Sequence, residues 1–276
     1  MTQSSFAPRL LIVVPTLNSF QLLPRLVASL RGQSREGWRV LFIDGPSGAE
    51  HRAWLQRLCA DDPRFAWIPQ DPALPGIFGA MNQGFAAAEP HDWLLFWGSD
   101  DWAASPEVFA RLEESLAEAH SAGAVPGLHP DLIVCRGRYV SVAAGLGCLG
   151  RATAFRWFGT YRRSLALGST PPHQATLIGP GARVCLSRYA SGFQLSADLD
   201  YFLQLSRFTE LRIARLDLEL VHMAEGGVSG LRHRRRLQEV RRAYRRAFGV
   251  LWPVPFLLRY MQRVLSLLEC RYRPKN

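Results

Sequence analysis

Cysteine is scarce in this sequence, which has five among 276 residues. They are odd in number, lie far apart and form no Cys-x-x-Cys pair, at Cys59, Cys135, Cys148, Cys185 and Cys270. A disulfide framework or a structural zinc site would need closely spaced pairs. The pattern therefore argues against both and favours a reducing compartment.

Long apolar runs are lacking as well. No run approaches the roughly 20 residues of a membrane-spanning helix. Residues 1–8 carry no charged side chain, and the apolar run Leu10–Val14 is too short for the core of a secretory signal. We therefore expect a cytoplasmic protein. No G-x-G-x-x-G follows this run, which argues against a dinucleotide-binding fold.

Positive charge is concentrated at one end of the chain. The formal net charge is +10, but residues 231–276 hold 13 of the 33 Lys and Arg residues and only 2 of the 23 Asp and Glu residues. The remaining residues are close to neutral overall. A strongly basic protein can indicate nucleic-acid binding. The near-neutral charge of residues 1–230 argues against that function. The 48% of hydrophobic residues is enough for an ordinary globular core.

Strand-like and helix-like spacings of apolar residues alternate along the first half of the chain. Short runs of branched and aromatic residues predict buried strands, and apolar residues three to four apart predict helices. The predicted strands are Leu10–Val14, Trp38–Ile43, Phe65–Ile68, Trp93–Trp97 and Asp131–Cys135, and the predicted helices are Phe20–Leu30, Ala49–Ala60, Gly76–Ala88 and Pro106–His120. This alternation predicts an α/β fold with a mostly parallel, Rossmann-like sheet flanked by helices.

The stretch Asp92–Trp102, DWLLFWGSDDW, combines a buried strand with two acids at its end. Adjacent carboxylates repel each other, so folding alone gives no reason to place Asp100 and Asp101 there. A divalent cation such as Mg²⁺ or Mn²⁺ prefers such oxygen ligands and can hold a diphosphate. The carboxyl edge of a parallel sheet is also where open α/β folds bind ligands. The alternative is that the acids simply lead into the next helix, with Ser105 as its cap.

Two further polar side chains are expected near the same edge. Asp44 follows the second predicted strand, where a carboxylate can accept hydrogen bonds from a ribose or a base. Asn82 lies on the helix that precedes the Trp93–Trp97 strand. Taken singly, each is more typical of a turn or of a satisfied surface group than of a ligand contact. Their convergence at successive strand ends is what favours a ligand site.

In this order, the motifs resemble those of inverting family-2 glycosyltransferases with the GT-A fold. The matching segments are PTLN (15–18), Gln33, FIDGPSG (42–48), GIFGAMNQGFAAA (76–88), LLFWGSDDW (94–102), PHQAT (172–176), SADLDY (196–201) and EGGVS (225–229). The resemblance covers residues 10–230. It implies an enzyme that uses a nucleoside-diphosphate sugar together with a divalent metal, Mn²⁺ or Mg²⁺.

The family pattern implies a set of nucleotide-sugar contacts at the matching positions. Thr16 and Asn18 would border the nucleotide. Asp44 would contact the base or ribose, and Asn82 would lie under the nucleotide sugar. These roles are what the resemblance implies, and spacing alone does not assign them.

The same pattern would make Asp100 the metal ligand, with Asp101 beside it to orient a donor-sugar hydroxyl or a metal-bound water. The sequence departs from the family at three glycines. Gly98 stands where many relatives have the first acid of the metal motif, Gly48 replaces an acid of the base-binding loop, and Gly79 occupies a position that is often acidic. These departures put in doubt which nucleotide base is preferred and how tightly the metal binds. They affect the prediction of glycosyl transfer less.

Asp198 is the candidate catalytic base. Inverting transfer needs one carboxylate to take the proton of the acceptor hydroxyl as it attacks the anomeric carbon. The stretch 193–205 is typical of a loop entering a helix, which puts Asp198 near the first turn and Asp200 on a different face. From spacing alone, two acids in a first turn indicate helix-dipole stabilisation. The resemblance is what favours catalysis by Asp198.

Other candidates depend more heavily on the resemblance. His173 and Gln174 match a His-Gln pair that lines the acceptor side in relatives. His222 would be a late metal ligand, with a core or surface histidine as the alternative. Ser229 would donate to the diphosphate from a Gly-Gly loop, with a plain turn as the alternative. Asp200 is a neighbouring acid in the same motif as Asp198.

The rest of the chain has two distinct parts. Residues 143–171 follow neither period and are interpreted as a variable insertion that faces the acceptor. Beyond a catalytic domain at 1–230, residues 231–276 form a basic tail with two predicted amphipathic helices, Arg234–Phe248 and Phe256–Glu269. Basic amphipathic helices suit an anionic membrane surface. The alternative is that they pack on the catalytic domain or on a second subunit of a homo-oligomer.

The sequence therefore predicts a metal-dependent, inverting glycosyltransferase at the cytoplasmic face of the membrane. Its acceptor would be a growing surface polysaccharide or a lipid-linked glycan, and nucleic acid is not an expected partner. A nucleotidyltransferase would need a glycine-rich basic loop after the first strand, which PTLNSF lacks. The non-enzymatic alternative is a degenerate GT-A domain that acts as a nucleotide-sugar sensor or scaffold, for which Gly98 and Gly48 are the arguments.

Overall fold

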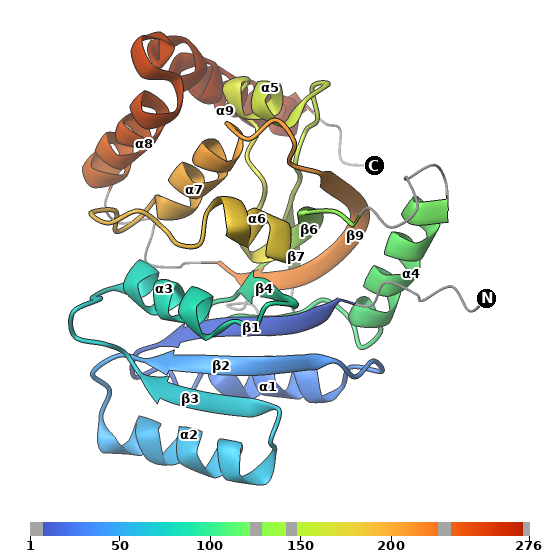
Figure 1. Cartoon of the computed structure of the whole chain (residues 1–276), viewed down its shortest axis with the longest axis vertical. Coiled ribbons are helices and arrows are strands. Elements are labelled where there is room, and N and C mark those ends of the chain that lie inside the picture. Colours follow the sequence, from blue (N-terminus) through green and yellow to red (C-terminus); the bar gives the residue numbers. More distant parts are fainter. Residues whose placement is uncertain (1–7, 122–128, 142–147, 226–232, 273–276) are drawn as a thin grey trace.

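The computed structural model describes residues 8–121, 129–141, 148–225 and 233–272. A strongly curled sheet runs through the molecule, and helices cover both of its faces (Figure 1). The strands are β1 (Arg9–Thr16), β2 (Trp38–Asp44), β3 (Phe65–Pro69), β4 (Asp92–Phe96), β5 (Asp101–Ala103), β6 (Leu132–Ser141), β7 (Cys148–Thr153), β8 (Thr176–Ile178) and β9 (Ile213–Ala224). The helices are α1 (Leu23–Arg31), α2 (Ala49–Asp61), α3 (Ile77–Ala87), α4 (Val108–Ser121), α5 (Tyr161–Ala166), α6 (Pro180–Cys185), α7 (Ala197–Leu205), α8 (His233–Phe248) and α9 (Pro253–Tyr272).

The first half of the chain folds as its apolar pattern predicts. The strands run in the order β3-β2-β1-β4-β8-β6-β9-β5, with β7 attached to β6. Strands β3, β2, β1 and β4 are parallel throughout. The predicted α/β fold with a mainly parallel sheet is confirmed there.

The second half of the sheet is mixed, which the sequence pattern did not predict. Strand β8 pairs antiparallel with both β4 and β6, and β5 pairs antiparallel with β9. Strand β9 was not predicted at all. Its inward side chains alternate with charged ones such as Arg215, Asp217 and Glu219, so it lacks the continuous apolar run that marks β1 and β4. The insertion at 143–171 contains β7 and α5.

Burial on both faces explains why β1 is apolar without interruption. Ile12 and Val14 belong to one hydrophobic cluster, together with residues of α1, α2 and α4. Leu11 and Val13 belong to a second cluster on the other face, with residues of α3 and α7. A strand between two clusters has no polar face, and its carboxyl end is held rigidly in place.

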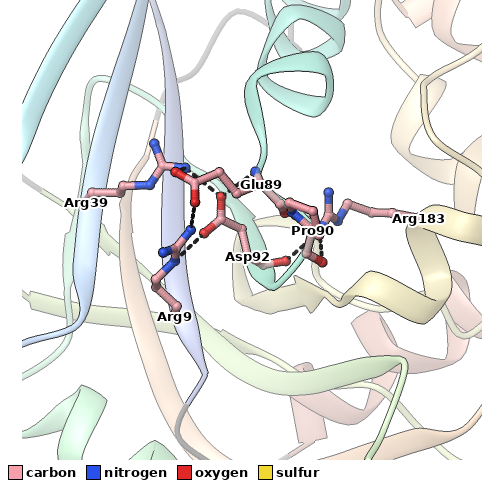
Figure 2. Close-up of polar contacts among 6 residues, drawn as sticks. All are labelled: Arg9, Arg39, Glu89, Pro90, Asp92 and Arg183. Carbon is pink, nitrogen blue, oxygen red and sulfur yellow. Dashed lines mark hydrogen bonds and ion pairs between the residues drawn. The ribbon is translucent and has the colours of Figure 1, made fainter.

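A network of arginines ties the opposite, amino-terminal edge of the sheet (Figure 2). The Asp92 side chain is fully buried and accepts hydrogen bonds from Arg9 Nε at 2.8 Å, Arg39 Nη2 at 2.6 Å and the Glu89 backbone N–H at 2.7 Å. Burial alone would raise the pKa of Asp92, but these donors outweigh burial and lower it. Arg183 donates to three backbone carbonyl oxygens of the same turn. This edge is therefore structural.

Helix α8 of the tail packs on the body of the protein. Its side chains Val240, Ala243 and Tyr244 belong to the same hydrophobic cluster as Phe202 and Leu205 of α7. The apolar stripe of α8 thus packs against α7, while most of the arginines of α8 stay exposed. The predicted boundary at residue 230 falls outside the described residues. Within the described part of the chain, no helix is long and apolar enough to cross a bilayer.

An ion pair fixes α8 to α7. The Asp200 carboxylate is 1% exposed, and Arg246 Nη1 lies 2.8 Å from its Oδ2. Burial raises the pKa of Asp200 to about 6, against the opposing charge of Arg246. Because the pKa in the folded state exceeds the ordinary value of about 3.8, the contribution of this carboxyl to stability is complete below pH 4 and is lost as the pH rises through 6.

We expect the substitution Arg246→Leu to destabilise the fold more at pH 8 than at pH 5. Without the guanidinium the pKa of Asp200 rises further, so a buried charge is left uncompensated only where the carboxyl is ionised. Because the Arg246 side chain is 39% exposed, we expect a loss of about 1–2 kcal/mol at pH 8. Urea denaturation at the two pH values measures it.

Arg245→Leu, which alters an exposed residue on the same helix, is the control and should change stability little at either pH. An equal loss for Arg246→Leu at pH 5 and pH 8 would show that the ion pair is not the cause.

Candidate functional site

The carboxyl ends of β1 and β2 are joined by polar side chains. Thr16 lies opposite Asp44 in the parallel register, and its Oγ1 donates to Asp44 Oδ1 at 3.1 Å. Ser47 Oγ donates to the same oxygen at 2.6 Å. Asn18, at φ 49°, accepts from the Gly48 backbone N–H at 2.8 Å. The predicted nucleotide-binding residues of β1 and β2 are therefore in contact with one another.

Asp44 is more deeply enclosed than a simple ligand contact would require. Its side chain is 2% exposed, with His51 Nε2 at 3.1 Å from Oδ1 and Arg52 Nε at 3.6 Å from Oδ2. Oδ2 is buried and has no hydrogen-bond partner within the described residues. In this structure Asp44 Oδ1 therefore connects the ends of β1 and β2 through Thr16 and Ser47. Asp44 Oδ2 can still accept a hydrogen bond.

The loop after β4 adjoins the loop after β1. Ser19 Oγ donates to Ser99 Oγ at 2.8 Å, and Ser99 Oγ donates to the Pro15 carbonyl oxygen at 3.3 Å. These contacts place Asp100 beside the PTLN segment. The chain thus brings three strand ends together at one edge, as the sequence predicts.

The two adjacent acids have different environments. Asp101 is 3% exposed, and its Oδ2 accepts from the Gly98 backbone N–H at 2.6 Å. Burial raises the pKa of Asp101 to about 7, and the negative charge of Asp100 adds to that rise. Asp100 is partly exposed, and no described residue gives it a hydrogen bond or an ion pair. Asp101 therefore supports the loop from inside, and Asp100 is the acid that remains free to bind a ligand.

Gly98 leaves room for the Asp100 side chain. A Cβ atom placed on Gly98 would lie 2.7 Å from Asp100 Oδ1. The described residues contain no group of three His, Cys, Asp or Glu side chains that could enclose a metal ion. Mg²⁺ and Mn²⁺ bound with nucleotide phosphates need only one or two carboxylates, since phosphates and water complete the shell. A single free acid at Asp100 fits such an ion.

The Asn82 side chain forms hydrogen bonds with the backbone of Tyr189. Its Nδ2 donates to the Tyr189 carbonyl oxygen at 3.1 Å, and its Oδ1 accepts from the Tyr189 N–H at 2.7 Å. Both ends of the amide are thus occupied by a single residue. The contact with a nucleotide sugar that the resemblance implies for Asn82 would require this pairing to open, so in this structure Asn82 positions Tyr189.

A cavity of about 360 Å³ lies next to this edge. It contains Asp198, His173 and Gln174, all three predicted from the resemblance. Asp198 lies in the first turn of α7, is half-buried, and receives no hydrogen bond or ion pair from the described residues. The other lining residues come from β6, from β7 and the residues after it, from the 168–172 loop, and from α7, β9 and α9. Among them are Arg151, Arg156, Ser169, Met223 and Arg259.

The ring of His173 forms part of the cavity wall and packs against aromatic side chains. Its ring stacks on Phe96 at a centroid distance of 5.6 Å and an interplanar angle of 8°, and Nε2 lies 2.7 Å from Tyr189 Oη. Burial lowers the pKa of His173, and the nearby charge of Asp198 partly opposes that shift. Near neutral pH the ring is therefore uncharged, and Asp198 is the only carboxylate among the described residues that line the cavity.

Short contacts connect the cavity with the edge that carries Asp100. Trp97 Nε1 donates to the Gln174 carbonyl oxygen at 2.9 Å. Met223, which lines the cavity, lies opposite Asp101 in the antiparallel pairing of β9 with β5. The cavity therefore adjoins the loop that carries the free acid, and the two form one continuous candidate site.

Two other predicted residues are not assembled into this site. Asp200 turns toward α8, where it pairs with Arg246. His222 Nε2 lies 2.8 Å from Glu219 Oε1, and its ring meets the edge of Trp102. Ser229 lies outside the described residues.

Glu239 is a residue that sequence reasoning missed. It lies on α8, is 6% exposed, and accepts from three successive backbone N–H groups, those of Gln194, Leu195 and Ser196, at 3.0, 2.8 and 3.0 Å. These groups immediately precede the helix that carries Asp198. The tail thus fixes the position of the candidate base. An isolated acid in a basic helix was the only signal in the sequence.

Comparisons with known proteins agree with this geometry. Residues 11–133 match the family model described as glycosyl transferase family 2. The chain is 29% identical over 206 residues to an uncharacterised glycosyltransferase of Mycobacterium tuberculosis, a match that covers 74% of this chain and 71% of that one. It is 26% identical over 196 residues to a PGL/p-HBAD biosynthesis glycosyltransferase of Mycobacterium bovis, with 71% and 68% covered.

Solved structures share the fold. Staphylococcus aureus TarS 1–349 in complex with UDP-GlcNAc superposes with a TM-score of 0.65 at 15% identity, covering 92% of this chain and 73% of that one. PcManGT, a mannosyltransferase from Pyrobaculum calidifontis in complex with GDP-Man and Mn²⁺, gives a TM-score of 0.59 at 13% identity, covering 95% and 76%. Against a longer TarS chain the match spans 39% of its length.

Proposed function

We propose that the chain, which has the GT-A fold, is a glycosyltransferase of family 2, whose model matches residues 11–133. It would transfer a sugar, with inversion, from a nucleoside diphosphate to an acceptor hydroxyl. The observation that carries the proposal is the Asp198 carboxylate. It lines the cavity without a partner among the described residues, next to the edge where Thr16, Asn18 and Asp100 assemble.

Asp198 would act as the general base. A carboxylate that is partly open to a cavity and is not neutralised by an arginine can take the proton of an acceptor hydroxyl as that hydroxyl attacks the anomeric carbon. Glu239 and the neighbouring packing of α7 hold Asp198 in place, so the base needs no rearrangement before the reaction. His173 is buried and serves to shape the wall.

The donor would bind along the edge formed by β1, β2 and β4. Thr16, Asn18 and Asp44 would surround the nucleoside, and Asp100 would hold a divalent metal together with the diphosphate. A bound Mn²⁺ or Mg²⁺ would stabilise the negative charge of the leaving diphosphate. Two fold neighbours, one in complex with UDP-GlcNAc and the other with GDP-Man and Mn²⁺, support this class of donor and cofactor.

The acceptor would enter the cavity at Asp198. One relative is named for PGL/p-HBAD biosynthesis, which supports a glycan or lipid-linked glycan as the acceptor class. Much of the cavity wall comes from residues 151–171 of the insertion. These residues carry no family motif and would determine which acceptor fits.

Association with the membrane would occur through the exposed side of α9. Val250, Leu251, Val254, Leu257 and Met261 form an apolar stripe on α9 and the turn before it, with exposed fractions from 59% to 91%. Exposed arginines of the adjacent helix α8 flank this end of the molecule. Such a surface matches the headgroups and acyl boundary of an anionic membrane.

Asp198→Asn should retain donor binding and lose transfer. Asparagine keeps the size and polarity of the side chain but cannot take a proton, so we expect the transfer rate to fall by about 10²–10⁴-fold. Donor binding is followed by thermal shift, and turnover by release of the nucleoside diphosphate. Asp61→Asn, which alters an exposed acid on α2, is the matched control and should be fully active.

Turnover that survives in Asp198→Asn would remove this residue as the base. Donor binding without turnover in the wild-type protein, for every acceptor tried, would favour the nucleotide-sugar sensor, for which the missing acid at Gly98 is the argument.

The double substitution Leu257→Ser and Met261→Ser should reduce binding to vesicles of phosphatidylglycerol and phosphatidylcholine by about tenfold or more, because two apolar side chains lose their transfer free energy. Co-sedimentation measures it, with vesicles of phosphatidylcholine alone expected to bind the wild type poorly. Val184→Ser, at a residue that is 89% exposed on α6, is the control. A change in oligomeric state with no change in vesicle binding would assign the stripe to a second copy of the chain.

A further inference from the structure

The cavity that contains Asp198 also contains an arginine with an unusual environment. Arg259 of α9 is 8% exposed and lines the cavity together with Gln262 of the same helix. Helix α9 approaches so closely here that a Cβ atom on Gly168, at φ +87°, would lie 2.5 Å from the Arg259 Cα. The 168–172 loop therefore fixes the position of this side chain.

The charge of Arg259 is not balanced by any described residue. Its Nη1 donates to Thr170 Oγ1, its Nε is buried without a partner, and no described carboxylate forms an ion pair with it. Arg138, Arg212 and Arg246 differ in this respect, since each pairs with a carboxylate. A buried guanidinium that lacks a counter-ion is costly, unless a ligand supplies one.

The composition of the cavity wall favours a negatively charged ligand. Arg151, Arg156 and Arg259 line it, and Asp198 is the only acid that the described part of the chain contributes to this wall. Because burial lowers the pKa of His173, that ring adds no charge near neutral pH. The wall is therefore net positive even when Asp198 is ionised. Guanidinium groups bind phosphate and carboxylate with paired, charge-assisted hydrogen bonds.

We propose that Arg259 is the centre of an anion-binding subsite that recognises a phosphate or carboxylate group on the acceptor. The proposal rests on the proposed function, because it assigns the cavity to the acceptor. None of the residues expected to hold the donor, Thr16, Asn18, Asp44 and Asp100, lines this cavity. The group that meets Arg259 belongs to the molecule whose hydroxyl faces Asp198. The acceptor is an anionic glycan, with its charge close to the hydroxyl that reacts.

The test uses the full-length protein and three small probes, namely glucose 6-phosphate, glucuronic acid and uncharged glucose, with binding followed by calorimetry or ligand-observed NMR. The wild type is expected to bind an anionic probe more tightly than glucose, and that preference is expected to weaken as salt is added. Arg259→Gln is expected to weaken binding of the anionic probe by about tenfold or more and to leave glucose unchanged. Which of the two anions binds more tightly distinguishes phosphate from carboxylate.

Two controls make the result specific. Arg245→Gln changes an exposed arginine outside the cavity and should bind the probes as the wild type does. Arg259→Lys keeps the charge but loses the paired donors, so an intermediate affinity is expected; it also serves as the test if the glutamine variant fails to fold.

Donor binding separates this proposal from the proposed function. Thermal shift with UDP- and GDP-sugars in Mn²⁺ should be the same in the wild type and in Arg259→Gln. If the wild type binds no nucleotide sugar, the proposed function fails, whatever the probes do. If the donor binds normally but the anionic probes bind no better than glucose, or if Arg259→Gln loses the nucleotide sugar and keeps the probes, the acceptor subsite is wrong.

Discussion

The parallel register of β1 between β2 and β4 determines which polar groups of this protein can meet. Thr16 lies opposite Asp44, and Val13 lies opposite Phe96, so the loops that follow these three strands leave the sheet at the same edge. The strands are buried on both faces and tied at their other ends by the Asp92 network. The loops after them therefore have little freedom, and Ser19 and Ser99 can bridge them directly.

The carboxylates described above are of two kinds. Some are buried and paired and hold the fold together, whereas two are partly exposed and could contact a ligand. Asp92, Asp131 and Asp200 are buried and paired with arginines, and Glu239 accepts from backbone N–H groups. Removing their partners would leave buried charges, so their role is to hold the fold. Asp100 and Asp198 are partly exposed and receive no such partner from the described residues. An acid that the fold leaves uncompensated at a sheet edge is available for a ligand.

Periodicity predicted the strands and helices of the first half of the chain because each buries a continuous or regularly spaced apolar face. The antiparallel pairing of β8 and the existence of β9 escaped it, since β9 mixes charged and apolar residues and β8 is three residues long. Only the resemblance to family 2 pointed to Asp198, His173 and Gln174, which the structure places in one cavity. Spacing alone did not, because an acid in a first helical turn has an adequate structural explanation.

Side-chain pairings could not be read from the sequence at all. Asn82 matches a family motif, but the structure shows its amide bound to the Tyr189 backbone, more than a hundred residues away in the chain. Asp101 is adjacent to Asp100, yet it faces inward beneath Gly98. The tail was predicted to be amphipathic, but only the fold shows that its two helices contribute Glu239 and Arg259 to the surroundings of Asp198. Contacts between segments that are distant in the chain depend on tertiary packing, which local sequence patterns do not predict.

The central claim is that Asp100 is a free metal ligand at an edge built for a nucleotide sugar. The most direct measurement is a thermal-shift panel of UDP-, GDP- and dTDP-sugars, with and without Mn²⁺, on the wild type and on Asp100→Asn. A ligand that binds only the folded state raises its melting temperature. The account predicts that at least one donor stabilises the wild type in a Mn²⁺-dependent way and that Asp100→Asn abolishes this effect. A panel without any stabilising donor, or a variant that keeps the Mn²⁺-dependent shift, would contradict it.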